Sequence, residues 1–287
     1  MFMWEQVCGT RPAVMGIVNV TPDSFSDGGR FLEPNDAVAH GVELVAQGAD
    51  ALDIGGESTR PGAAPVAADE ELRRVLPVVE RLVDATNVPV SIDTTKSAVA
   101  RAALEAGATV VNDVSAGRFD PDILRVAADA RAGFVVMHML GEPRTMQRDP
   151  HYDDVVVDVG DFLAERVDAA RAAGIADGAI AADPGIGFGK TVEHNLFLLA
   201  RLRTLSQRVP APLIVGTSRK TFIGRLLGRA TGASGDLPVD QRDEGSLATA
   251  VWSVEQGASI VRMHDVLGTA RAVRLLDVLR SAEASAA

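Results

Sequence analysis

The sequence predicts an α/β protein with the architecture of a (β/α)8 TIM barrel, and three observations support this prediction. Eight short apolar runs rich in Val and Ile lie along the 287 residues, and a stretch with helical spacing of apolar residues follows each run. The runs are continuously apolar rather than alternating, which is typical of parallel strands buried on both faces. Their starts lie roughly 35 residues apart, which is close to the length of one βα unit.

The predicted strands are spaced evenly and belong to a single domain. They comprise residues 14–20, 51–54, 88–92, 109–112, 133–138, 179–182, 212–215 and 259–262. An open, doubly wound sheet is the alternative, but eight even units without a nucleotide-binding fingerprint favour the barrel. Because no linker or shift in composition divides the chain, we predict one domain over residues 1–287, in which residues 1–13 form an N-terminal extension.

The composition excludes several classes of function. Lys and Arg number 28 against 39 Asp and Glu, and this net charge of −11 argues against a nucleic-acid-binding protein. The single cysteine, Cys8, cannot form an internal disulfide, and no CxxC pair is present to hold zinc. Residues 1–12 do not resemble a signal peptide, and no window of about 20 residues is free of charge, so no membrane span is predicted. We therefore expect a soluble protein of a reducing compartment, the cytoplasm.

Polar residues follow all eight predicted strands, at the end of the barrel where active sites lie. A single polar residue there could simply cap the next helix, whereas polar residues at every end are typical of the rim of a pocket. The residues concerned are Asn19, the segment 55–60 (GGESTR), Asp93, Asn112 and Asp113, His138 and Met139, Asp183, Ser218, Arg219 and Lys220, and Arg262, Met263 and His264.

Two kinds of chemical group meet at this rim. Guanidinium groups, with backbone amides of glycine-rich loops, suit a phosphorylated or pyrophosphorylated ligand, although each arginine alone could equally form an ion pair. This set contains Asn19, Arg60, Ser218, Arg219, Arg262 and His264. Carboxylate and amide groups suit a flat heterocycle that carries an amino group and a ring N–H. This second set contains Asp93, Asn112, Asp183 and Lys220, with Phe188 as an aromatic face on which a ring could pack.

Three polar loops rich in glycine or proline are candidate lids over the barrel mouth. They comprise residues 21–30, 57–65 and 139–152, and plain connection length is the alternative explanation. Single histidines are more often structural than catalytic, and His194 is expected to cap the helix that begins there.

These motifs, in this order, resemble those of the dihydropteroate synthase family. The matching segments are NVTPDSFSDGG (19–29), DIGGESTRPGA (53–63), SIDT (91–94), NDVS (112–115), MHMLGEPRTMQ (137–147), DPGIGFGK (183–190), TSRKTFIG (217–224) and VRMHDV (261–266). The resemblance covers nearly the whole chain. It implies a pterin-binding TIM barrel of folate biosynthesis, usually a homodimer and a sulfonamide target. It also implies that 4-aminobenzoate displaces diphosphate from (7,8-dihydropterin-6-yl)methyl diphosphate to give 7,8-dihydropteroate.

The resemblance also implies roles for individual residues. Asn19 matches the family's contact with magnesium and diphosphate, so Mg²⁺ is the expected cofactor. The other diphosphate contacts are Thr59, Arg60, Arg262 and His264; the pterin contacts are Asp93, Asn112, Asp183 and Lys220, with Met137 or, preferably, Met139. The 4-aminobenzoate contacts are Pro61, Phe188, Lys220 and Thr221, the last a threonine where many members carry serine. The expected catalytic set is Asn19, Asp93, Asp183, Lys220, Arg262 and His264.

The implied chemistry agrees with the two kinds of group at the rim. Diphosphate leaves, a cation forms at the pterin methylene carbon, and the arylamine attacks it without a strong general base. Two alternatives remain at this point. A pterin-binding methyltransferase barrel has no use for a diphosphate clamp, and a non-catalytic relative would be expected to lose clamp or loop residues.

Overall fold

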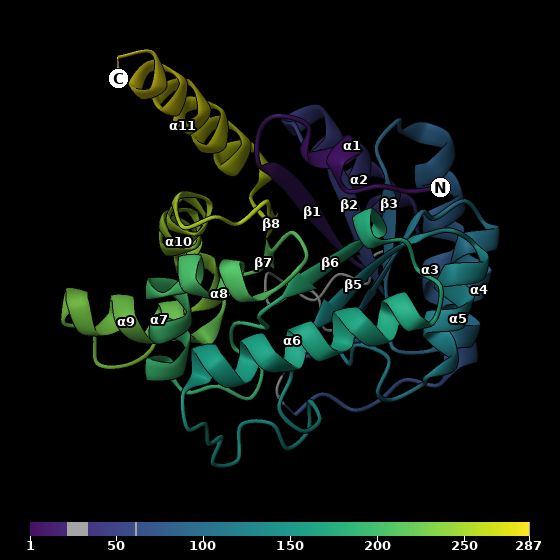
Figure 1. The fold of residues 1–287 in the computed structure, drawn as a ribbon, viewed down its shortest axis with the longest axis horizontal. Helices are drawn as coiled ribbons and strands as arrows, with labels where there is room; N and C mark the ends of the chain where they lie inside the picture. The colour runs from purple at the N-terminus through teal and green to yellow at the C-terminus, as the bar shows by residue number, and fades with distance from the viewer. Residues whose placement is uncertain (22–33, 61, 287) are drawn as a thin grey trace.

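The computed structural model, which describes residues 1–21, 34–60 and 62–286, has eight parallel strands in one nearly closed barrel (Figure 1). The strands are β1 (Ala13–Asn19), β2 (Ala51–Gly55), β3 (Val90–Asp93), β4 (Val110–Asp113), β5 (Gly133–Met137), β6 (Ile180–Asp183), β7 (Ile214–Val215) and β8 (Ile260–Met263). They pair in the order β6-β5-β4-β3-β2-β1-β8-β7. A parallel bridge between Ala182 and Leu213 joins the two outer strands of that order. The predicted (β/α)8 TIM barrel is confirmed.

All eight predicted strands exist, and their ends differ from the prediction by up to two residues. The largest shifts fall on β3 and β7, which begin at Val90 and Ile214 rather than at Val88 and Pro212. Proline has no backbone N–H and therefore cannot donate to a neighbouring strand. Their carbonyl groups still accept hydrogen bonds, from Leu52 at 3.0 Å and from Ala182 at 3.0 Å.

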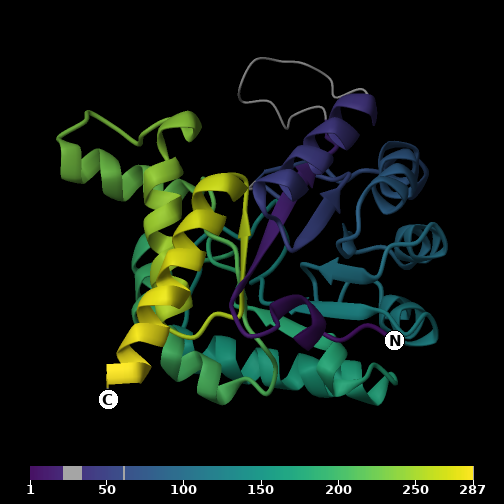
Figure 2. The same cartoon turned by 90° about the horizontal axis from the view of Figure 1, so that it is seen from above.

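The helices surround the barrel. They are α1 (Glu5–Cys8), α2 (Pro34–Gln47), α3 (Ala68–Ala85), α4 (Ser97–Glu105), α5 (Asp122–Asp129), α6 (Val155–Ala172), α7 (Val192–Ala200), α8 (Leu202–Arg208), α9 (Thr221–Thr231), α10 (Asp243–Glu255) and α11 (Val266–Ala286), with 3₁₀ turns at Asp177–Ala179 and Val239–Gln241. Figures 1 and 2 show α3, α4 and α5 on one side of the strands and α10 and α11 on the opposite side. None of the described helices is both long and apolar enough to cross a membrane.

Burial on both faces of the sheet explains the continuous apolar runs. Every residue of β2, β4, β5 and β6 is buried, including the polar ones. Apolar side chains of the surrounding helices cover the outer face, as Val75, Val78 and Leu82 of α3 do. Burying each such side chain contributes about 1.5–3 kcal/mol to folding. A polar residue inside one of these strands therefore needs a specific partner.

The segment before β1 covers the N-terminal end of the strands. Trp4 is buried, its indole N–H donates to the Ala179 carbonyl at 3.0 Å, and its ring packs edge-on against Phe2 at 5.0 Å between centroids. A Cβ atom at Gly133, the first residue of β5, would lie 2.5 Å from the Phe2 ring, so only glycine fits there. This closed end leaves the opposite end, where the strands terminate, for a binding site.

Candidate active site

The C-terminal ends of the strands open into one cavity of about 750 Å³. A volume of this size is typical of a site for small molecules. Eleven of the thirteen residues predicted for the site line it: Asn19, Thr59, Arg60, Asp93, Asn112, Asp183, Phe188, Lys220, Thr221, Arg262 and His264. The strand ends therefore bring the carboxylate set and the arginine set together.

The other two predicted residues are not among those that line the cavity. Met139 is buried behind the wall, in an apolar cluster with Met137, Met146 and Phe188. Met137 and Met146 line the cavity in its place, because β5 ends at Met137 and the chain turns away after it. Pro61 lies outside the described residues.

Arg262 lies at the centre of a buried ionic network. Its Nε donates to Asp53 at 2.6 Å and its Nη2 donates to Asp93 at 3.0 Å. Asn112 donates from Nδ2 to the same Asp53 oxygen at 2.9 Å. Asp53 was not among the residues predicted for the site, although a carboxylate within an apolar strand is a signal of a specific role. Arg262 is thus paired inside the barrel rather than at its surface.

The carboxylates of the cavity have raised pKa values because they are buried. Burial and the neighbouring charge of Asp53 raise the pKa of Asp93 to about 8, while Arg262 acts in the opposite direction. Burial also raises the pKa of Asp183, opposed by the ammonium group of Lys220. Asp183 accepts a hydrogen bond on Oδ1 from the Gly185 N–H at 2.6 Å. A ligand whose N–H groups donate to these oxygens would favour the charged form of each carboxyl and so would oppose the effect of burial on both pKa values.

Two lysines donate hydrogen bonds to backbone carbonyl groups of the loop of residues 184–190, Lys220 from outside the loop and Lys190 from its last position. Lys220 donates to the Ile186 carbonyl, and its Nζ lies 4.7 Å from the centroid of the Phe188 ring. Lys190 donates to the carbonyl groups of Gly185 at 3.0 Å and Phe188 at 3.1 Å. Lys190 was not predicted for the site, because the apolar residues of its loop follow neither the spacing of a strand nor that of a helix.

Glycine is required at the first turn of this loop. Gly185 has φ of 63°, and a Cβ atom there would lie 1.9 Å from the carbonyl oxygen of His138. The close approach of these two backbones fixes Phe188 at the cavity wall. His138 does not line the cavity, and its Nδ1 lies 2.8 Å from Nζ of Lys190, which does.

The buried His138 makes stability depend on pH. Burial and the charge of Lys190 lower the pKa of His138 from 6.5 to about 2, so the ring is neutral in the folded protein. Below pH 6.5 the unfolded chain binds a proton at His138 and the folded chain does not. The free energy of unfolding therefore decreases as the pH is lowered, by up to about 1.4 kcal/mol per pH unit. We expect His138→Gln to reduce the slope of unfolding free energy against pH, measured by urea denaturation between pH 7 and 5.

His151 provides the control for this prediction, because its side chain is 85% exposed. His151→Gln should keep the slope of the wild type. An unchanged slope in His138→Gln would contradict the prediction.

His264 is oriented by Ser218 at the arginine side of the cavity. The Ser218 hydroxyl accepts from the backbone N–H of His264 at 3.1 Å and lies 2.9 Å from its Nδ1. Burial and nearby arginines lower the pKa of His264 to about 3, so the ring is neutral. If the hydroxyl donates to Nδ1, the proton of the neutral ring is on Nε2 and can be donated to a ligand. Arg219, by contrast, forms an ion pair with Asp243 at 2.8 Å, as the alternative for single arginines anticipated.

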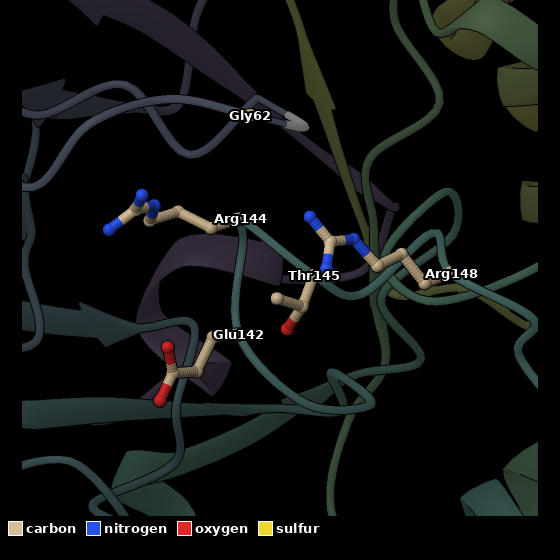
Figure 3. A pocket seen from close by; sticks show the side chains of 5 residues that line it. All are labelled: Gly62, Glu142, Arg144, Thr145 and Arg148. Atoms are coloured by element: carbon tan, nitrogen blue, oxygen red, sulfur yellow. The ribbon is translucent and has the colours of Figure 1, made fainter.

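Two of the predicted lid loops are connected to each other and to the cavity wall. The Gly62 N–H donates to the Pro143 carbonyl at 3.2 Å, and Nε2 of Gln147 donates to the Gly187 carbonyl at 2.6 Å. A second hollow of about 480 Å³ lies at this junction, where Arg144 and Arg148 lie between Gly62 and Glu142 in the view of Figure 3. The third predicted lid, residues 21–30, lies outside the described residues except for Thr21. That these loops act as lids stays a prediction.

The capping role predicted for His194 is confirmed. The Thr191 hydroxyl accepts from the His194 N–H at 3.1 Å, and His194 Nδ1 accepts from the Thr191 N–H at 3.3 Å. This reciprocal pair begins α7 and satisfies two backbone donors that a helix start leaves unpaired.

Two side chains near Gly55 could supply oxygen ligands to a cation, and the remaining ligands would come from water and substrate. Asn19 Oδ1 and Asp93 Oδ2 lie 3.9 Å and 3.7 Å from the position that a Cβ of Gly55 would occupy. Among residues 1–21, 34–60 and 62–286, no group of three or more His, Cys, Asp or Glu could hold a metal ion. Mg²⁺ keeps several waters and takes phosphate oxygens from its substrate, so a site with few protein ligands fits it.

Comparison with known proteins identifies the relatives of the chain. A family described as pterin binding enzyme matches residues 15–264. The dihydropteroate synthase of a Synechocystis species is 45% identical over 280 residues, which cover 97% of this chain and 92% of the relative. The structure of Xanthomonas albilineans dihydropteroate synthase with 4-aminobenzoic acid is 50% identical and superposes with a TM-score of 0.85 over 94% of this chain and 93% of that one. The Burkholderia cenocepacia enzyme complexed with 7,8-dihydropteroate is 46% identical, with a TM-score of 0.83 over 96% and 94%.

Proposed function

The chain belongs to the dihydropteroate synthase family of pterin-binding enzymes, and we propose how its own residues carry out the reaction of that family. In this reaction 4-aminobenzoate displaces diphosphate from (7,8-dihydropterin-6-yl)methyl diphosphate, and 7,8-dihydropteroate forms. One observation carries the assignment of roles. A single cavity contains buried carboxylates together with arginine and histidine side chains at the same strand ends.

The carboxylate side of the cavity would hold the pterin. Asp93 and Asp183 would accept hydrogen bonds from the amino and ring N–H groups, which are charge-assisted contacts that fix orientation. Asn112 and Lys220 would form hydrogen bonds with the remaining polar groups of the ring, and Met137 would pack against the ring. When the leaving group departs, the same carboxylates stabilise the positive charge on the ring.

The arginine side of the cavity would hold the diphosphate. Arg60 and Arg262 provide guanidinium groups that match phosphate oxygens, and neutral His264 donates a further hydrogen bond. Thr59 lines the same part of the cavity. Bound Mg²⁺, held in part by the amide oxygen of Asn19, supplies charge neutralisation to the diphosphate. These donors stabilise the negative charge that develops as the carbon–oxygen bond breaks.

The arylamine would lie between the loop of residues 184–190 and the start of α9. Phe188 provides an aromatic face, and the carboxylate of 4-aminobenzoate would meet Thr221 at the first position of this eleven-residue helix. Unpaired N–H groups and the helix dipole make such a position suitable for an anion. Pro61 stays a prediction for this subsite.

The amine is nucleophilic without deprotonation, so no residue is assigned as a base. Loops closed over the cavity would exclude water that competes with the amine.

The assigned reaction is tested by measuring diphosphate release with both substrates, each alone, and neither. We expect release that depends on both substrates and formation of 7,8-dihydropteroate in equal amount. A methyltransferase would release no diphosphate. A non-catalytic relative would bind the pterin diphosphate in isothermal titration without turnover, and either result would reject the assignment.

Thr221 allows a separate test of the 4-aminobenzoate subsite. Thr221→Val keeps the shape of the side chain but removes the hydroxyl that would bind the carboxylate. A lost hydrogen bond to a charged group costs about 1.5–3 kcal/mol, so KM for 4-aminobenzoate should rise by about 10–100-fold. KM for the pterin diphosphate should stay near the wild-type value, and Thr221→Ser should restore activity. Thr231→Val, at the other end of α9, is the matched control.

We also propose that the protein is a cytoplasmic homodimer. Helices α7, α10 and α11 lie on one side of the molecule (Figure 1) and expose large apolar side chains. These are Leu196 and Phe197 of α7, Trp252 of α10, and Leu275, Val278 and Leu279 of α11. Contiguous exposed apolar surface is typical of protein interfaces. Sedimentation equilibrium tests this assembly, and a monomer at micromolar concentration would reject it.

A further inference from the structure

Asp53 is a buried carboxylate that contacts two residues of the cavity without lining the cavity itself. It lies in the middle of β2, and its side chain is fully buried. It is not among the residues that line the 750 Å³ cavity. Asp53 therefore does not touch a ligand in that space and affects ligands only through its neighbours.

The hydrogen bonds of Asp53 join the two halves of the proposed site. Its Oδ2 accepts from Nε of Arg262 at 2.6 Å and from Nδ2 of Asn112 at 2.9 Å. Its Oδ1 has no partner among the described residues. Burying a carboxylate in this way is costly unless it is paired, so the position is ill suited to packing alone.

The bond to Nε determines how the guanidinium group is presented. A guanidinium is planar and rigid, so anchoring Nε limits the group to small rotations about this bond and restricts the directions that both terminal nitrogens can take. With Nε on Asp53, Nη2 reaches Asp93 at 3.0 Å at the cavity wall. Asp93 is one of the carboxylates proposed to hold the pterin. Arg262 therefore has one fixed contact behind the wall and one contact that a ligand can replace.

We propose that Asp53 is a positioning residue that anchors Arg262 through Nε, so that pterin binding at Asp93 transfers Nη2 of Arg262 from Asp93 to the diphosphate. This inference rests on the proposed function and adds to it an order of contacts. In the free protein Nη2 of Arg262 donates to Asp93. When pterin N–H groups occupy Asp93, Nη2 loses this partner and turns to the leaving group, while Nε stays on Asp53.

The first test is Asp53→Asn, which keeps the size of the side chain and removes its charge. We expect two constants to rise by about 10–100-fold, since small displacements of a binding group have effects of this size. They are the KM of the pterin diphosphate and the Kd of inorganic diphosphate in the presence of a saturating pterin that lacks the diphosphate. KM for 4-aminobenzoate should change less than twofold. Equal KM values for all ligands in variant and wild type would overturn the proposal.

Ser91 supplies the matched control. It lies opposite Asp53 in the register of β2 and β3, it is fully buried, and its hydroxyl has no partner among the described residues. Ser91→Ala therefore disturbs the same layer of the barrel without touching Arg262. We expect wild-type KM values from this variant, and a loss equal to that of Asp53→Asn would mean that the effect is only structural.

A double-mutant cycle identifies the partner through which Asp53 acts. In the background of Arg262→Gln, adding Asp53→Asn should change the Kd of diphosphate, measured with the same pterin present, by less than twofold. An additional tenfold loss in this background would show that Asp53 acts by another route and would overturn the proposal.

If Asp53→Asn does not fold, a measurement on the wild type tests the proposal instead. In ¹⁵N spectra of arginine side chains, the Nε–H signal of Arg262, assigned with Arg262→Gln, should exchange slowly with water. Binding of pterin diphosphate should shift its Nη signals and leave the Nε signal in place. Fast exchange of Nε–H, as expected for the exposed Arg73, or loss of the signal on binding would overturn the proposal. Failure of the proposed function is distinct, since the wild type would then show no turnover.

Discussion

Asp183→Asn is expected to weaken pterin binding by about 100-fold or more. The Oδ1 atom of Asp183 already accepts the Gly185 N–H at 2.6 Å. If the amide oxygen of asparagine keeps this bond, its NH₂ group points into the cavity and faces the N–H donors of the pterin. Two donors then oppose each other, and a charge-assisted contact is lost together with its charge. Truncating one partner of a buried charged hydrogen bond costs about 2–5 kcal/mol.

Isothermal titration with a pterin that lacks the diphosphate measures this effect directly, because the arginine side of the cavity then contributes nothing. Asp183→Ala should give a similar loss. Asp113→Asn is the matched control, since Asp113 is also buried at a strand end and accepts the N–H groups of Ser115 and Gly117 at 2.7 Å and 2.6 Å. It does not line the cavity. Near-normal pterin affinity in Asp183→Asn would refute the role of Asp183.

The fold could be predicted because a barrel strand is buried on both faces. Each β-strand then becomes a short apolar run, and each run is separated from the next by a helix of regular period. The prediction was weakest at strand ends. Pro89 and Pro212 lie just before β3 and β7 and contribute carbonyl groups to the barrel, yet they cannot donate to it. Sequence pattern does not separate such a residue from a strand residue.

Most of the site could be predicted because chemistry in this fold gathers at one end of the strands. Met139 shows the limit of that reasoning. It is adjacent to a strand end, but the direction of a side chain after the last strand residue depends on the turn, and here Met137 faces the cavity instead. Asp53 and Lys190 were missed for a related reason. The partner of Asp53 is Arg262, which is distant in the sequence. The partners of Lys190 are backbone carbonyl groups of its own loop, which no pattern of side chains indicates.

Lys220 is expected to produce the second large effect, because it contacts three parts of the site at once. Its ammonium group donates to the Ile186 carbonyl, lies 4.7 Å from the Phe188 ring centroid, and opposes the charge of Asp183. Lys220→Met removes all three interactions. The Asp183 charge would then be buried without its counter-charge, which costs about 3–5 kcal/mol. We expect kcat/KM to fall by about 10²–10³-fold.

The pH dependence of activity distinguishes the charge of Lys220 from its packing. Burial lowers the pKa of Lys220 from 10.5 to about 8, so the wild-type ammonium group loses its proton as pH rises through 8. The folded enzyme then has Asp183 without the Lys220 cation, which opposes its charge most strongly among the side chains, and kcat/KM should decrease on the alkaline side of pH 8. Lys220→Arg, whose guanidinium stays protonated, should retain a measurable rate and lack this alkaline decrease. An alkaline decrease at the same pH in Lys220→Arg would assign it to another group, and the role of the Lys220 charge would then be wrong.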